Sequence, residues 1–133
     1  MRIEELSVGD YVRFNGSPYI VEEISGKGWI HILDINNKVR AKLSSDYILD
    51  FIDGVPLIPE ILLKNGYYLL SEEDKQYRLD IQEGVHITID FKDDDEPWVH
   101  VSNRCYYATP YCRYVHHLQH AMSLCGIYLG FKI

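Results

Sequence analysis

The chain lacks a long apolar run. A membrane-spanning helix needs about 18 to 20 consecutive apolar residues, and no stretch of the sequence approaches that length. The opening residues, MRIEELSVGD, also lack an apolar signal segment. The sequence therefore indicates no membrane association, and we expect the protein in the cytoplasm.

Cysteine is scarce as well. The three cysteines, Cys105, Cys112 and Cys125, are odd in number and show no Cys-x-x-Cys spacing. In a reducing compartment such a set is typical of free thiols and not of a disulfide framework. We therefore expect no disulfide bonds.

Basic residues are few. The chain has 13 Lys and Arg against 20 Asp and Glu, a net charge of −7. Both halves are acidic, with ten acidic and seven basic residues in 1–66 and ten and six in 67–133. Because nucleic-acid binding depends on neutralising phosphates, this balance argues against a general DNA or RNA binder. A local exception stays open, in which the N-terminal part binds nucleic acid through Arg13, Lys27, Arg40 and Lys42.

What the chain does have is β-prone sequence and enough apolar residues, 47% of 133, for a core. Residues 1–54 alternate short β-prone runs with Gly, Asn and Pro turns, which predicts a β-meander. Within it, VGDYVRFNGSPYIVEEI resembles the opening of an SH3-like small barrel of the KOW type. That resemblance implies a barrel-like first subdomain. We interpret residues 55–66 as a connector with a short helix at Pro59–Lys64, since proline suits the first helical position.

Residues 67–133 predict an antiparallel sheet with one helix packed across it, so the fold class is α+β. Apolar residues at every second position from Val85 to Phe91 indicate a strand with one buried face. Pairing this strand with Trp98–Ser102 predicts Asp90 opposite His100.

One long helix is predicted from Thr109 to Gly126, after a tyrosine-rich bend at Arg104–Tyr107. Thr109 is a favoured N-cap, and Gly126 suits the left-handed residue that follows a helix. At about 100° per residue, the apolar residues form one stripe that we expect to be buried: Tyr111, Tyr114, Val115, Leu118, Ala121, Met122 and Cys125. The other side is predicted to be polar and to face solvent: Cys112, Arg113, His116, Gln119, His120 and Ser123.

Two segments carry a family resemblance. ILLKNGY, after Ile58-Pro59, and YVHHLQH, from Tyr114 to His120, resemble segments of small uncharacterised proteins from Bacteroidetes genomes and their phages or integrated elements. The resemblance implies an accessory protein of phage or mobile-element origin and names no catalytic residue. His117 stands where that pattern has glutamine.

The sharpest candidate for chemistry is the row Cys112, His116 and His120. A pair at i, i+4 can bind one zinc ion, but eight residues of helix rise about 12 Å, so all three cannot converge. A third ligand would have to come from elsewhere: His100, Asp90 or Cys105. The alternative, which we favour, is a hydrated polar helix face and no cofactor. A metalloprotease is excluded, because His117 replaces the glutamate of a His-Glu-x-x-His motif.

Two further possibilities concern acidic and thiol groups. The acidic residues of 90–96 (Asp90, Asp93, Asp94, Asp95 and Glu96) lack the glycine and terminal glutamate of a calcium loop, so we interpret them as a hydrated hairpin tip. Cys112 with His116 has the residue types for thiol catalysis, since a helix N-terminus lowers the thiol pKa. Their position on one predicted helix is nonetheless an unfavourable catalytic geometry.

Tyr106, Tyr107 and Leu124 lie outside the predicted apolar stripe and are therefore candidate contact residues. With no complete catalytic set in the sequence, we expect a non-enzymatic protein that binds a protein partner or associates with itself. Metal binding at the histidines and nucleic-acid binding by the N-terminal part are the alternatives.

Overall fold

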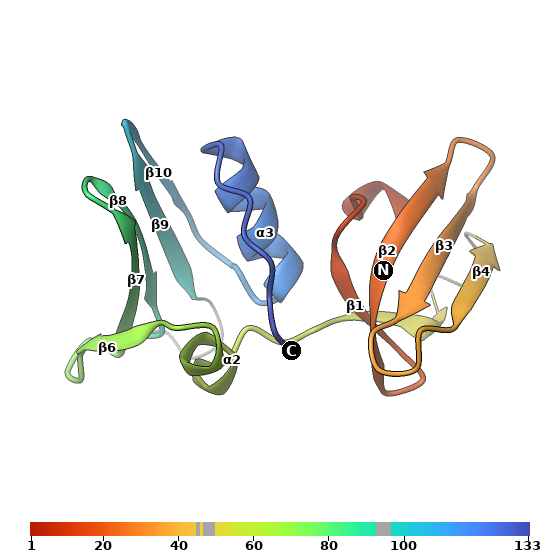
Figure 1. Cartoon of the computed structure of the whole chain (residues 1–133), viewed down its shortest axis with the longest axis horizontal. Coiled ribbons are helices and arrows are strands. Elements are labelled where there is room, and N and C mark those ends of the chain that lie inside the picture. The colour runs from red at the N-terminus through yellow and green to blue at the C-terminus, as the bar shows by residue number, and fades with distance from the viewer. Residues whose placement is uncertain (45, 47–49, 93–96) are drawn as a thin grey trace. The chain divides into compact units, whose positions relative to one another are not determined.

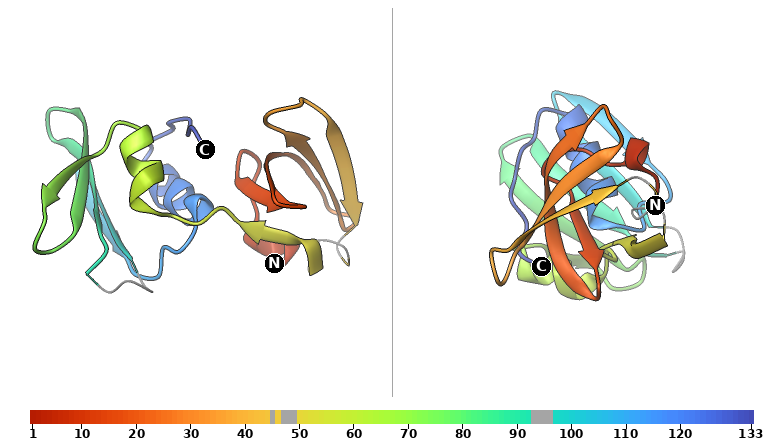
Figure 2. Two further views of the ribbon diagram at one scale, coloured as in Figure 1. Left: turned by 90° about the horizontal axis from the view of Figure 1, so that it is seen from below. Right: turned by 90° about the vertical axis from the view of Figure 1, so that its right-hand side faces the viewer.

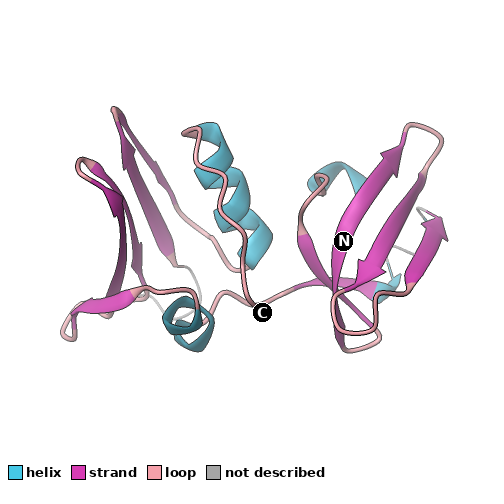
Figure 3. Cartoon of the chain, viewed as in Figure 1, coloured by secondary structure: helices cyan, strands magenta, loops and turns pink. Residues whose placement is uncertain are grey.

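The computed structural model of the chain describes residues 1–44, 46, 50–92 and 97–133. The chain folds into two compact units, Met1–Val55 and Pro56–Ile133. Each unit contains one five-stranded antiparallel sheet, and strands predominate in both (Figures 1 and 3). The predicted α+β class is confirmed in this broad sense, with a larger share of β structure than of helix.

The first unit is a meander whose fifth strand returns to the first. After a short 3-10 helix, η1 (Ile3–Glu5), the strands are β1 (Tyr11–Phe14), β2 (Ser17–Ser25), β3 (Trp29–Asp34), β4 (Arg40–Ser44) and β5 (Ile52–Gly54). Their order in the sheet is β4-β3-β2-β1-β5. Strands β4 and β5 do not pair with each other in the described part of the chain. The predicted meander is therefore present, but the sheet does not close into a barrel.

Local sequence explains the first hairpin and the irregular burial in β2. Asn15 and Gly16 both have positive φ, 51° and 76°, which the two-residue turn between β1 and β2 requires. Between Val21 and Glu23 the pairing of β2 with β3 shifts by one residue. This bulge breaks the alternation of buried and exposed side chains, so the sequence of β2 does not show a single apolar face.

The second unit combines a sheet with two helices. Helix α2 (Pro59–Lys64) coincides with the predicted short helix. The strands are β6 (Tyr68–Ser71), β7 (Gln76–Gln82), β8 (Val85–Asp90), β9 (Trp98–Asn103) and β10 (Cys105–Thr109), in the order β10-β9-β8-β7-β6, and α3 (Val115–Leu124) follows. Both helices lie on the same face of the sheet (Figures 1 and 2).

The predicted register between β8 and β9 is wrong by two residues. Asp90 lies opposite Trp98, whereas His100 lies opposite Thr88. Side chains alternate with a period of two, so a shift of two residues leaves every side chain on its predicted face. The apolar alternation therefore determined which side chains are buried and could not determine the register.

The predicted bend and the predicted start of the long helix are also wrong. Residues 105–109 form β10, which pairs with β9 through Tyr107 opposite Val101. Helix α3 begins only at Val115, because the preceding segment, in which Tyr111 has a positive φ of 62°, is bonded to distant residues. The Cys112 N–H donates to the Pro97 carbonyl at 3.0 Å, and the Leu57 N–H donates to the Arg113 carbonyl at 2.8 Å.

Helix α3 covers the apolar face of the central strands. Its buried side chains Val115, Leu118, Ala121 and Met122 belong to the predicted stripe, and the strands beneath contribute Ile87, Ile89, Val99 and Val101, none of which is exposed. The stripe prediction fails at its N-terminal end, since Tyr111 precedes the helix and is exposed. No helix in the described residues is long and apolar enough to cross a membrane.

The packing of α3 leads to a stability prediction. Replacing buried Leu118 with alanine should lower the free energy of unfolding of the second unit by about 2–5 kcal/mol, because it removes apolar contacts and leaves a cavity. The same change at exposed Leu124 should cost less than about 0.5 kcal/mol. Urea unfolding followed by Trp98 fluorescence, in a Trp29→Phe background, measures both. Equal losses for the two variants would contradict the packing described.

Candidate interaction groove

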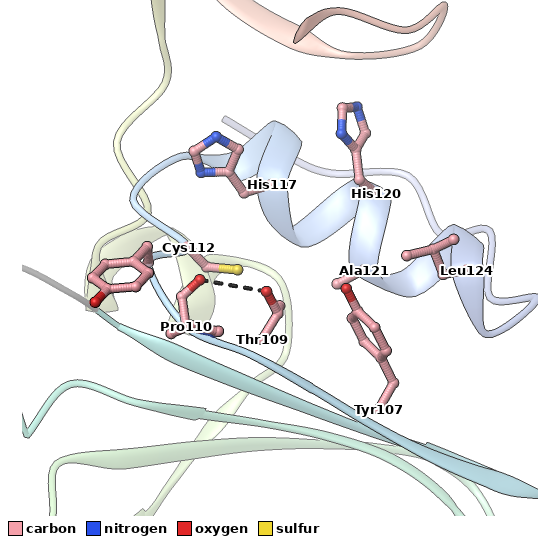
Figure 4. A pocket seen from close by; sticks show the side chains of 9 residues that line it. Tyr107, Thr109, Pro110, Cys112, His117, His120, Ala121 and Leu124 are labelled. Atoms are coloured by element: carbon pink, nitrogen blue, oxygen red, sulfur yellow. Dashed lines mark hydrogen bonds between the residues drawn. The ribbon is translucent and has the colours of Figure 1, made fainter.

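A small pocket lies between β10 and α3, and it contains residues that the sequence singled out for two different reasons. Its volume is about 290 Å³. Strand β10 contributes Tyr107 and Thr109, the non-helical segment after it contributes Pro110 to Cys112, and α3 contributes the rest. We call this the β10–α3 groove (Figure 4).

The helical wall follows from sequence spacing. His117, His120, Ala121 and Leu124 stand at i, i+3, i+4 and i+7, which places them on one side of a helix. Figure 4 shows the Tyr107 phenol directed toward Ala121, with the two imidazoles on the part of α3 turned away from that phenol. The groove therefore has an apolar and aromatic interior with imidazoles at its rim.

The strand wall follows from the register of β10. Tyr107 and Thr109 lie opposite Val101 and Val99, so both are on the helix-covered face of the sheet. The Thr109 hydroxyl donates to the Pro110 carbonyl at 3.4 Å. The strand is at the edge of the sheet, because β9 is its only partner strand among the described residues.

Of the three predicted contact residues, two line the groove and one does not. Tyr107 and Leu124 line it, and the Leu124 side chain is 69% exposed. Tyr106 alternates to the other face of the sheet, where its hydroxyl lies 2.5 Å from Nδ1 of His100. Tyr111, which the sequence assigned to the buried stripe, instead lines the groove and is exposed.

Cys112, His116 and His120 do not form a row on one helix. Cys112 precedes α3, so it is not one turn away from His116 on a common helix. The prediction that His116 faces solvent is wrong too, because its side chain is only 1% exposed. Its ring stacks on Tyr114, with centroids 5.5 Å apart and planes 9° apart.

The histidines of α3 nevertheless lie close together. The His116 ring centroid is 4.5 Å from that of His117 and 5.7 Å from that of His120. Within the described residues, no set of three or more His, Cys, Asp or Glu side chains is arranged to hold a metal ion.

The other residues named as ligands are accounted for separately. His100 contacts Tyr106, and the Asp90 carboxylate accepts the Lys92 N–H at 2.8 Å. The Cys105 side chain and the acidic residues Asp93 to Glu96 lie outside the part that the structure describes.

The environment of Cys112 contradicts its interpretation as a nucleophile. The side chain is only 2% exposed, and burial raises the pKa of the thiol to about 11. A thiol with this pKa is protonated at neutral pH, whereas nucleophilic attack needs the thiolate. The sequence suggested a lowered pKa because it placed Cys112 at a helix N-terminus, whereas α3 begins only at Val115.

Two of the four basic residues considered for nucleic-acid binding have partners within the first unit. The Arg40 guanidinium lies 2.8 Å from a Glu22 carboxylate oxygen, and the Lys42 ammonium lies 4.5 Å from the centroid of the Trp29 ring. Arg13 lies opposite Asp53 in the sheet. Nearby acidic groups therefore reduce the positive potential that phosphate binding would use.

Comparisons with models of protein families, with characterised proteins and with solved structures find no match for this chain.

The buried thiol leads to a prediction about pH. In the unfolded chain a cysteine ionises near its usual pKa of 9.0, whereas in the folded chain Cys112 ionises near 11. The contribution of the protonated thiol to the free energy of unfolding is therefore fully present below pH 9. It is lost as the pH rises toward 11. Relative to a Cys112→Ala variant, the wild type should lose about 2 kcal/mol of unfolding free energy between pH 8 and 11. Urea titrations measure the difference, and parallel pH curves would show that burial does not shift this pKa.

Proposed function

We propose that the chain is a non-enzymatic protein-binding module that uses the β10–α3 groove. The observation that carries the proposal is a pocket at the β10 edge of the sheet whose aromatic and apolar walls include the exposed residues Tyr111 and Leu124. Clefts between an edge strand and a helix suit an extended protein segment, since the edge offers backbone groups and the pocket accepts a side chain.

The pocket favours an apolar or aromatic side chain of the partner as its occupant. Its walls include Pro110, Ala121 and Leu124, and its polar groups include the Tyr107 hydroxyl, the Thr109 hydroxyl and the rim imidazoles. Tyrosine in such a position combines a large apolar ring with a hydrogen-bonding end, which is why it is common at interface centres. The Cys112 thiol, which is protonated at neutral pH, forms part of the pocket wall and does not act as a nucleophile.

Two features of the wider role rest on the sequence. The segments ILLKNGY and YVHHLQH support an accessory role in a phage or mobile element. Cys112 and Cys125 are free thiols, which supports action in the reducing cytoplasm.

We also propose that the first unit is an open SH3-like meander. Its strand order, β4-β3-β2-β1-β5, brings the last strand back beside the first, which supports that assignment.

The groove proposal predicts which exposed residues a partner needs. Tag-immobilised wild type should retain a protein from a lysate of the organism that encodes it. A Leu124→Asp variant places a charge on the apolar wall. It should retain less of that protein by a factor of about ten or more. The control is Val39→Asp, which places the same charge on an exposed valine of the first unit. Quantitative mass spectrometry compares the amount of protein retained by the wild type and by each variant. Equal amounts on Leu124→Asp and Val39→Asp would overturn the proposal.

Metal binding is the second candidate, and the close packing of three imidazole rings in α3 favours it. His116 and His120, at i and i+4, would be the ligands after a change of side-chain rotamer.

Calorimetric titration of zinc into the chain, prepared without a histidine tag, tests this second candidate. We expect one zinc ion per chain and an affinity at least about tenfold lower in His120→Gln. The matched control is His86→Gln, a histidine of β8. No heat of binding, or equal loss in both variants, would exclude a site on α3.

A further inference from the structure

We propose that the face of the second sheet opposite to its helices is a binding site for a neutral oligosaccharide. The surface on which the sugar would stack consists of Trp98, His100 and Tyr106, which we call the ring row. These side chains belong to β9 and β10, and helices α2 and α3 lie on the other side of the sheet (Figures 1 and 2). No residue of the ring row lines the β10–α3 groove, so this site does not depend on the function proposed above.

The strand register places the three rings side by side. Trp98 and His100 alternate with buried Val99 on β9, so both lie on the face away from the helices. On β10, Tyr106 lies opposite Ser102, which is the next outward residue of β9. The ring centroids of Trp98 and His100 are 6.3 Å apart with planes 20° apart, and those of His100 and Tyr106 are 5.9 Å apart with planes 36° apart. The rings therefore form a continuous row across two strands.

The ring row is exposed and held in place. Trp98 is 42% exposed and Tyr106 is 69% exposed. The Tyr106 hydroxyl lies 2.5 Å from Nδ1 of His100, which fixes these two side chains against each other. Side chains that are ordered before binding lose little conformational entropy when a ligand arrives. The C–H groups on one side of a sugar ring suit such a surface, because the face of an aromatic ring carries negative partial charge.

Hydrogen-bonding groups lie on the same face, beside the ring row. The Arg78 guanidinium donates from Nε to one oxygen of Asp80 at 2.8 Å, and the Tyr68 hydroxyl donates to the other at 2.6 Å. Carboxylate and guanidinium groups can make further hydrogen bonds beyond these two. Thr88 connects this cluster to the ring row, since it lies opposite Arg78 on one side and His100 on the other. Sugar hydroxyls both donate and accept, so neighbouring donors and acceptors match them.

The charges of this face favour a neutral ligand. Among the outward positions of the described strands, Arg78 is the only Lys or Arg, and it is paired with Asp80. Asp90 lies opposite Trp98 and adds a negative charge next to the ring row. Single-stranded nucleic acid also stacks on aromatic side chains, but it needs basic groups along its phosphates. The ring row therefore suits a sugar better than a nucleobase.

The composition of the face also disfavours a protein as the occupant. In the described residues of β8, β9 and β10, no outward position carries Leu, Ile, Val, Met or Phe. The centre of a protein interface is typically depleted of charge, whereas here Asp80 and Asp90 lie on the same face as the rings. Burying these carboxylates under a protein would be costly, but sugar hydroxyls replace the water that they lose.

Native gels that contain a soluble neutral polysaccharide test this inference. The full chain is run in hydroxyethyl cellulose, galactomannan, laminarin and pullulan, and we expect at least one polymer to retard the wild type. Trp98→Ala should bind that polymer at least about tenfold more weakly, because it removes the largest ring of the row. The matched control is Trp29→Ala, which removes a tryptophan of the first unit and should be retarded like the wild type. Circular dichroism checks that each variant is folded.

A solution titration tests the hydrogen-bonding cluster. In a Trp29→Phe background, an oligosaccharide cut from the retarding polymer should change the fluorescence of Trp98 as it binds. Asp80→Ala should lower the affinity about fivefold, since it removes an acceptor and releases Arg78. Glu73→Ala removes the same charge from the exposed turn after β6 and should leave the affinity unchanged.

Four outcomes would overturn the inference. They are no retardation by any of the neutral polymers, equal retardation of the wild type and Trp98→Ala, binding of a uridine dodecanucleotide that Trp98→Ala abolishes, and sedimentation data showing a dimer that Tyr106→Ala dissociates. In the third case the occupant is nucleic acid, and in the fourth it is a second copy of the chain. Protein retention by the β10–α3 groove is measured separately with Leu124→Asp, so either proposal can fail alone.

Discussion

The second unit depends on one packing constraint, the burial of the apolar side of α3 on the middle of a five-stranded sheet. Burying a large aliphatic side chain is worth about 1.5–3 kcal/mol, and the contact between α3 and the central strands buries several of them. A helix with its side chains is only about 10 Å across, whereas the outer strands of five lie about 19 Å apart. Helix α3 therefore stabilises the sheet centre and does not by itself reach both margins. The β10–α3 groove lies at one of these margins.

A second constraint determines where the helix can begin. The main chain between Pro110 and Tyr114 makes hydrogen bonds with Pro97 and Leu57, and Pro56 forms an isolated β-bridge with Tyr114. Such bonds between distant residues keep the segment out of a helix, although Thr109-Pro110 has the composition of a helix start. As a consequence Cys112 is buried beside the sheet, and its chemistry is that of a protonated core thiol.

Much of the architecture could be predicted from local sequence. Most of the strands, the helix at Pro59–Lys64 and the Asn15-Gly16 turn follow from alternation, capping and turn preferences that act over a few residues. The β8–β9 register, strand β10 and the start of α3 could not be predicted in the same way. Each is decided by contacts between residues far apart in the chain, and alternation is unchanged by a two-residue shift.

The residues of the candidate groove could also be predicted only in part. Tyr107 and Leu124 were identified because they fall outside the predicted stripe, and both line the pocket, whereas their role in binding stays a prediction. His117 and Ala121 could have been found with them, since the spacing of 117, 120, 121 and 124 defines one helical side. The burial of His116, whose ring stacks on Tyr114, was not predicted, because the helical spacing placed His116 on the polar side.

A sheet with two accessible margins also has a geometric meaning for assembly. The outer strands β6 and β10 are held about 20 Å apart by the hydrogen bonds between the five strands, so the number of strands sets this separation. Two molecules that contact the two margins would therefore be kept at that distance from each other.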